Sequence, residues 1–89
     1  MVEQQIEIIN KLGVHARAAA KLVTVASAFA SQIAIIRDEK SVDSKSIMSV
    51  MMLAASKGSW ITIRCEGSDE TAAMEAVCQL INNRFDEDE

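Results

Sequence analysis

Residues 2–29 read VEQQIEIINKLGVHARAAAKLVTVASAF, and the hydrophobic period changes once within them. Over residues 2–9 apolar and polar side chains alternate, as they do in a half-buried strand. After a polar turn at residues 10–15, the chain is rich in alanine and its apolar residues recur at helical spacing, at Ala19, Leu22, Ala26 and Phe29. The pattern therefore predicts a strand, a turn and a helix that begins at Ala16.

The middle of the chain repeats this change of period. β-Branched residues predict a strand at 32–37, and a polar turn then leads into a short strand at 41–43, so that the two form a hairpin. Ser46 stands where a helix N-cap is expected, and the apolar residues after it predict a short second helix to about Ala55.

The last third of the chain contains one more strand and one more helix. Residues 60–66 alternate, with Ile61, Ile63 and Cys65 on one face. Residues 68–70 are expected to cap a final helix that runs to about residue 83. Its predicted buried stripe consists of Ala73, Ala76, Val77, Leu80 and Ile81.

The predicted element order is β-α-β-β-α-β-α. Strands that alternate, rather than being apolar throughout, indicate an antiparallel sheet with helices on one face, so the fold class is α+β, an open-faced sandwich. The 89 residues, 49% of them apolar, allow one domain. We place this domain at residues 1–85 and an acidic tail, expected to be disordered, at residues 86–89.

The charge distribution excludes several classes of partner. The net charge is -4, but four of the 13 acidic residues lie at 86–89, which leaves nine acidic and nine basic residues in the domain. Nucleic-acid binding needs clustered bases and stacking aromatics, and the chain has scattered bases and three aromatic residues. We therefore expect no nucleic-acid partner.

Neither a membrane segment nor a metal site is expected. The longest apolar run, residues 50–55, is far shorter than a membrane-spanning helix requires, so we expect no membrane insertion. The first residues lack a signal-peptide pattern, so a cytoplasmic location is expected. Cys65 and Cys78 lie too far apart for a metal-binding pair and are interpreted as small buried hydrophobic residues.

His15 and Arg17 are the candidate chemical groups, because they lie at the predicted start of the first helix. Unpaired backbone N–H groups and the helix dipole favour an anion such as a phosphoryl group there, and Arg17 adds a forked donor. The same dipole disfavours a charged imidazole, so we expect His15 to be largely neutral at pH 7 and nucleophilic. The alternative is that His15 is an exposed capping residue and Arg17 a solvated one.

Two motifs decide between these interpretations. NKLGVHAR, residues 10–17, resembles the active-site signature of the HPr family, the histidine-containing phosphocarriers of the bacterial phosphotransferase system. KSIMSVM, residues 45–51, is similar to the family's second signature, around the serine that HPr kinase modifies, and lies at the usual distance from the histidine. The resemblance covers nearly the whole chain and implies a four-stranded antiparallel sheet with three helices on one face.

The resemblance also implies a function. His15 would accept a phosphoryl group on Nδ1 from enzyme I, which is charged by phosphoenolpyruvate, and pass it to a histidine of an enzyme IIA, while Arg17 steadies the group. The protein would be a relay rather than an enzyme with its own small substrate, without cofactor or metal, and a monomer. Ser46 would be a regulatory site for an HPr kinase/phosphorylase. The structural alternative for Ser46 is an ordinary N-cap.

The resemblance further implies a docking surface for these partners. Its residues would be Ala16 and Ala20 of the first helix and Ile47, Met48 and Met51 of the second. Periodicity alone favours burying these apolar residues of the second helix in the core. The resemblance favours exposure for Met48 and Met51 more than for Met52.

Some residues depart from the family pattern. Ala18 replaces the usual proline after the arginine, which affects preorganisation more than helix formation. Positions that are basic in many relatives are uncharged here, namely Thr24, Ser27 and Ser49. The C-terminal residues are similar to a nitrogen-related branch of the family, so a regulatory protein that does not feed sugar transport is the alternative function. A small-ligand-binding domain of the same fold class lacks a glycine-rich phosphate loop to support it.

Overall fold

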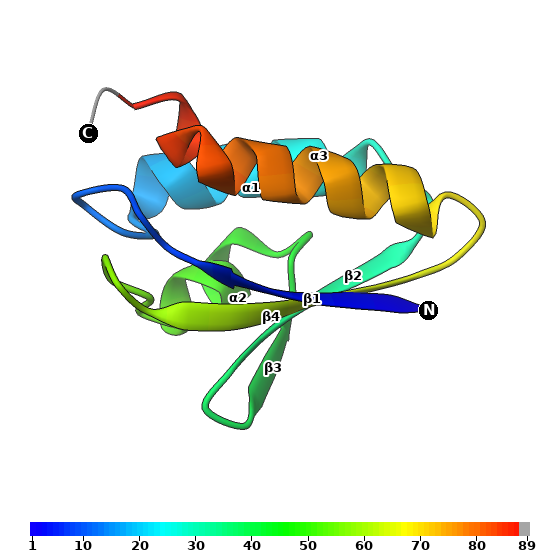
Figure 1. Ribbon diagram of the computed structural model, residues 1–89, viewed down its shortest axis with the longest axis horizontal. Helices are drawn as coiled ribbons and strands as arrows, with labels where there is room; N and C mark the ends of the chain where they lie inside the picture. The colour runs from blue at the N-terminus through cyan, green and yellow to red at the C-terminus, as the bar shows by residue number, and fades with distance from the viewer. Residues whose placement is uncertain (88–89) are drawn as a thin grey trace.

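The computed structural model describes residues 1–87 and contains four strands, three α-helices and one 3-10 turn (Figure 1). In chain order the elements are β1 (Val2–Glu7), α1 (Ala16–Ser27), β2 (Gln32–Arg37), β3 (Lys40–Asp43), α2 (Ile47–Met52), β4 (Trp60–Glu66), α3 (Glu70–Asn82) and η1 (Arg84–Asp86). The predicted order of strands and helices is therefore confirmed.

The strands form one antiparallel sheet in the order β1-β4-β2-β3. Because side chains alternate across the sheet, the isoleucines of neighbouring strands meet on one face, with Ile6 opposite Ile61 and Ile35 opposite Ile63. Helices α1 and α3 lie across that face, as Figure 1 shows. The opposite face carries polar and charged side chains together with Trp60, which is 61% exposed.

The three helices contribute side chains to a single hydrophobic core. Helix α1 buries Ala18, Ala19, Leu22 and Ala26, and α3 buries Ala73, Met74, Val77, Cys78, Leu80 and Ile81. The short helix α2 contacts α1 and β3 and contributes Val50 to the same core. Small alanines on α1 let this helix approach the sheet closely, and the larger side chains of α3 and the strands fill the remaining space.

Some element boundaries and one buried position differ from the prediction. Helix α2 ends at Met52 rather than near residue 55, because the chain turns at Leu53 and Ala54 has a positive φ of 52°. On α3, Ala76 is only half-buried, whereas Met74 and Cys78 are buried. Strand β1 ends at Glu7, two residues earlier than predicted, although Ile8 still exchanges backbone hydrogen bonds with residues 58 and 59.

The expectation of disorder after Phe85 is wrong for Asp86 and Glu87. The Phe85 side chain is fully buried, and the 3-10 turn η1 spans Arg84–Asp86, across the expected end of the domain. Glu87 then contacts residues near the start of α1. Residues 88 and 89 of the expected tail lie outside the described residues.

Both cysteines are buried free thiols, as predicted. Burial raises the pKa of Cys65 and of Cys78, because the apolar surroundings disfavour the thiolate.

Asp69 stands at the N-cap of α3, but its side chain does not cap the helix as predicted. Instead its carboxylate accepts hydrogen bonds from the N–H groups of Ala30 and Ser31, each at 2.9 Å, and from the Ser31 hydroxyl. These bonds tie the α1–β2 connection to the start of α3. The Ser31 hydroxyl and the two N–H groups hold the pKa of Asp69 below its usual value of 3.8.

Replacing Asp69 with asparagine should therefore make stability less dependent on pH. A carboxyl whose folded pKa is depressed stabilises the fold above its unfolded pKa and loses that contribution as pH falls through the folded value. We expect D69N to lower the urea midpoint at pH 7, and the difference from wild type to shrink below about pH 4. A difference that stays constant down to pH 2 would contradict this assignment.

Candidate functional site

The loop before α1 is built around two residues that hold His15 in place. Asn10 is fully buried, and its Nδ2 donates to the Gly13 carbonyl at 2.8 Å. Gly13 has φ +66°, and a Cβ there would lie 2.5 Å from the Ala55 carbonyl oxygen. The next N–H, that of Val14, donates to this same oxygen at 2.9 Å. The loop is thereby fixed against the chain that follows α2.

His15 is the N-cap of α1 and has a different partner on each ring nitrogen. Nδ1 accepts a hydrogen bond from the Arg17 N–H at 3.3 Å, and Nε2 lies 2.5 Å from Oε2 of Glu87. A backbone N–H can only donate and a carboxylate can only accept, so the ring carries its proton on Nε2 and a lone pair on Nδ1. The ring nitrogen with the lone pair is thus the one at the positive end of α1.

Glu87 belongs to this site, and the sequence analysis missed it. Its side chain is 15% exposed, and Oε1 accepts a hydrogen bond from Nδ2 of Asn10 at 2.8 Å. Burial alone would raise the pKa of Glu87, but hydrogen bonds from His15 and Asn10 and the nearby charge of Lys21 outweigh it and lower the pKa. The neutral state of His15 expected from the sequence stays a prediction.

Arg17 lies in the first turn of α1 with its side chain exposed. Among residues 1–87 its guanidinium has no hydrogen-bond or ion-pair partner, so all of its donors are available to a ligand. It borders a shallow hollow between α1 and the C-terminal turn, which is also lined by Lys21 and Asp86. The two predicted chemical groups therefore occupy adjacent positions at one helix end.

The predicted docking residues are exposed on two helices in contact. Ala16 and Ala20 are exposed on α1, and α2 exposes Ile47 (39%), Met48 (67%) and Met51 (39%). The periodicity-based interpretation of these three side chains as core is wrong, since Val50 alone among the residues of α2 is buried. We call these five residues the α1–α2 surface.

Two further apolar residues are exposed and were not predicted to be. Met52 is 72% exposed, more than Met48, so the expectation that it is the more buried of the two is wrong. Leu12, in the loop before His15, is 67% exposed. Hydropathy alone did not distinguish these residues from core residues, because a helix of six residues has no complete repeat to define its buried side.

Ser46 is the N-cap of α2, and its Oγ accepts from the Ser49 N–H at 3.4 Å. Its side chain is partly exposed and directly precedes Ile47 and Met48 of the α1–α2 surface. The capping role is therefore present, and the regulatory role of Ser46 stays a prediction.

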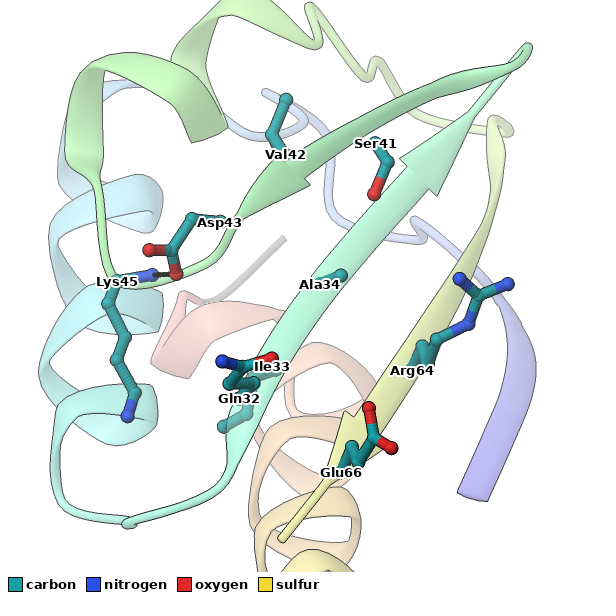
Figure 2. Close-up of a pocket in the computed structure, with 9 residues that line it drawn as sticks. All are labelled: Gln32, Ile33, Ala34, Ser41, Val42, Asp43, Lys45, Arg64 and Glu66. Carbon is teal, nitrogen blue, oxygen red and sulfur yellow. Dashed lines mark hydrogen bonds between the residues drawn. The ribbon is translucent and has the colours of Figure 1, made fainter. Parts of the chain in front are cut away.

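A second hollow, of about 420 Å³, lies on the sheet face away from α1 and α3 (Figure 2). It contains none of the predicted site residues, and three of its four charged residues have partners within the fold. Arg64 pairs with Glu3, the Asp43 carboxylate accepts from the Lys45 N–H, and Lys45 Nζ donates to the Phe29 carbonyl. Figure 2 shows Arg64 and Glu66 on β4 and Asp43 at the end of β3, around Ala34 at the centre.

The part of the chain from residue 1 to 87 contains no group of three or more His, Cys, Asp or Glu side chains arranged to hold a metal ion. In the same part, no helix has the length and apolar character needed to cross a bilayer.

The fold and the site match those of known proteins. The family model described as "PTS HPr component phosphorylation site" matches residues 2–83. The chain is 53% identical over 89 residues to the phosphocarrier protein HPr of Cupriavidus necator, with all of both chains covered. It is also 43% identical to the phosphocarrier protein NPr of Shewanella violacea, covering 97% of this chain and 94% of that one.

The solved structures agree with these relatives. A crystal structure of HPr from Thermoanaerobacter tengcongensis superposes with a TM-score of 0.96 at 46% identity, covering all of both chains. The fold and these relatives together place the chain among the phosphocarrier proteins. The chain belongs to the HPr family of the phosphotransferase system.

Proposed function

We propose that His15 is the phosphoryl acceptor of this phosphocarrier, taking the group from phosphorylated enzyme I and delivering it to a histidine of an enzyme IIA. The observation that carries this proposal is the pair of contacts to the His15 ring, which leave Nδ1 unprotonated at the N-terminus of α1. The protein acts in the cytoplasm as a monomer. It is a relay that carries the group without turning over a substrate of its own.

The transfer needs little more than positioning and charge stabilisation. The lone pair of Nδ1 forms the new N–P bond while the bond between phosphorus and the enzyme I nitrogen breaks, and that nitrogen keeps the electron pair. The Arg17 N–H that now faces Nδ1 is then free to donate to a phosphoryl oxygen. The unpaired Arg17 guanidinium supplies further donors and a positive charge.

The test is phosphorylation of the wild-type protein. Incubation with enzyme I and phosphoenolpyruvate should add the mass of one phosphoryl group, and acid treatment should remove it, because phosphohistidine is labile in acid and phosphoserine is stable. No added mass with a folded protein, or an acid-stable group alone, would overturn the proposal.

The α1–α2 surface is the proposed docking site for enzyme I and enzyme IIA. Its methionines are flexible and polarisable, which suits a surface that must fit several partners. It lies on the helix that carries His15 and on the helix in contact with it.

Met48→Asp should reduce the rate of phosphorylation by enzyme I about tenfold without unfolding the protein, since the side chain is 67% exposed. The matched control is Ala72→Asp, which adds the same charge at an exposed position near the start of α3. Equal rates for wild type and M48D at limiting enzyme I would remove Met48 from the docking surface.

Ser46 is the proposed regulatory phosphorylation site, for an HPr kinase/phosphorylase. A phosphate at this N-cap would place roughly two negative charges beside Ile47 and Met48 and so repel acidic partners. Ser46→Asp should slow phosphorylation of His15 by enzyme I about tenfold. Ser68→Asp, at an exposed position just before α3, controls for the added charge, and equal rates for S46D and S68D would contradict the proposal.

The second candidate function is regulatory, and the similarity to an NPr protein over nearly the whole chain favours considering it. In this case the phosphorylation state would control partner proteins, without feeding sugar transport. The two functions differ in the acceptor. Transfer from the phosphorylated protein to sugar-specific enzyme IIA proteins supports the transport role, whereas transfer confined to a nitrogen-branch enzyme IIA supports the regulatory one.

A further inference from the structure

The C-terminal turn is built to bring one carboxylate onto the ring of His15. Three successive residues without glycine, Arg84, Phe85 and Asp86, have positive φ values of 56°, 54° and 62°. Such backbone costs about 1 kcal/mol or more per residue and persists only where packing and hydrogen bonds impose it. The turn reverses the chain after α3, so that Glu87 points toward the start of α1.

Several contacts impose this turn. The Phe85 side chain is 0% exposed, and its carbonyl accepts a hydrogen bond from Lys21 Nζ at 2.8 Å. The N–H groups of Asp86 and Glu87 donate to the carbonyls of residues 83 and 84, each at 3.0 Å. The turn is therefore anchored in the core and to α1, and the position of Glu87 does not depend on its own side chain alone.

The Glu87 carboxylate is held through both of its oxygens. Oε1 accepts from the buried Asn10, and Oε2 contacts Nε2 of His15. Asn10 also holds the Gly13 carbonyl, so one side chain orients both the loop that carries His15 and the carboxylate that contacts it. The other charged groups near this contact are Arg17 and Lys21 on α1 and Asp86 in the turn.

We propose that Glu87 is a positioning residue for phosphoryl transfer at His15, a role that rests on the proposed function. Its carboxylate keeps the proton on Nε2 and the lone pair on Nδ1. Carboxylates that accept a hydrogen bond from a metal-bound histidine fix its tautomer in the same way. When Nδ1 bonds to phosphorus, the ring becomes cationic and the carboxylate balances that charge. On onward transfer the N–P electron pair returns to the ring, which leaves as a neutral imidazole with its Nε2 proton still in place.

This role predicts a change in the pH profile rather than a simple loss of function. Without the carboxylate, the phosphorylated ring should lose its Nε2 proton at lower pH, and an anionic ring is a poorer leaving group. In E87Q and E87A, the profile for transfer from the phosphorylated protein to an enzyme IIA should move about one pH unit lower, which means about tenfold slower transfer on its alkaline side. E87Q keeps a hydrogen-bond acceptor without the charge, and E87A removes both.

The control is Asp86→Asn, which removes one negative charge from the same turn at a residue that makes no side-chain hydrogen bond within residues 1–87. D86N should follow the wild-type profile within about twofold. A second readout is the Nε2–H resonance of phosphorylated His15, which should be protected from exchange in wild type and D86N and lost in E87A. Thermal unfolding of all four proteins verifies that they are folded.

The outcomes separate the two proposals. Normal phosphorylation at His15 with four superimposable pH profiles and an unchanged Nε2–H resonance would overturn the role of Glu87 and leave the phosphocarrier function standing. No phosphorylation of any of the four folded proteins would overturn the proposed function and the role of Glu87 with it. A pH profile that moves to lower pH in E87Q and E87A, but not in D86N, supports the role of Glu87.

Discussion

His15→Ala is expected to reduce phosphoryl incorporation from enzyme I to below detection. His15 is the only histidine in the chain, so no second imidazole can substitute. Among the hydroxyl groups, that of Ser31 contacts the Asp69 carboxylate, but it is buried and out of reach of a phosphoryl donor. The measurement is intact mass after incubation with enzyme I and phosphoenolpyruvate, with the acid-labile fraction quantified in parallel.

The alanine variant also removes an N-cap, so its loss of activity must be separated from a loss of stability. The His15 cap bond is long, at 3.3 Å, and its removal should cost about 0.5–1 kcal/mol. His15→Asn keeps a side chain that caps helices well but has no ring nitrogen, and it should be equally inactive. Acid-labile phosphate on either variant would show that another residue is the acceptor.

Gly13→Ala is expected to destabilise the protein by about 2–4 kcal/mol and to slow phosphorylation of His15. The φ of +66° disfavours any L side chain, and the added Cβ would lie 2.5 Å from the Ala55 oxygen and 2.8 Å from Ser56 Cα. Both are backbone atoms, so the loop rather than a side chain must move. That movement breaks the Val14 to Ala55 hydrogen bond and displaces His15 from its cap position.

Gly58→Ala is the matched control for backbone strain. Gly58 also has a positive φ, of +91°, but an added Cβ there would meet nothing within 4 Å. Gly58→Ala should lower the free energy of unfolding only through the unfavourable backbone conformation of alanine, by about 1 kcal/mol. Urea unfolding gives both values, and a G13A variant no less stable than G58A would show that the close approach to residues 55 and 56 does not constrain the loop.

The elements of this protein were largely predictable because each depends on local pattern. The strands at 32–37 and 60–66 were predicted to the residue, since alternation and flanking turn residues define a strand without reference to its partners. Helix α2 was predicted too long. Its end depends on the turn at Leu53 and Ala54, where Ala54 has a positive φ and the next carbonyl accepts a hydrogen bond from Val14 in the loop before α1.

The candidate site was predictable in part. The motif around His15 and the N-cap position of Ser46 were visible in the sequence, because both lie at helix starts and capping is a local property. The exposure of Met52 and Leu12 was not visible, since a short helix and a loop carry no repeat that separates surface from core.

By itself, then, the sequence determined the order of strands and helices, the antiparallel sandwich and the histidine at the start of α1, because periodicity and capping act over a few residues. Tertiary structure alone decided that Asp69 holds the α1–β2 connection and that Glu87, 72 positions from His15, pairs with its ring. The physical reason is that these contacts join residues far apart in the sequence. Whether they form depends on how the helices and strands pack in three dimensions. Here the burial of Phe85 imposes a left-handed turn that no local residue preference favours.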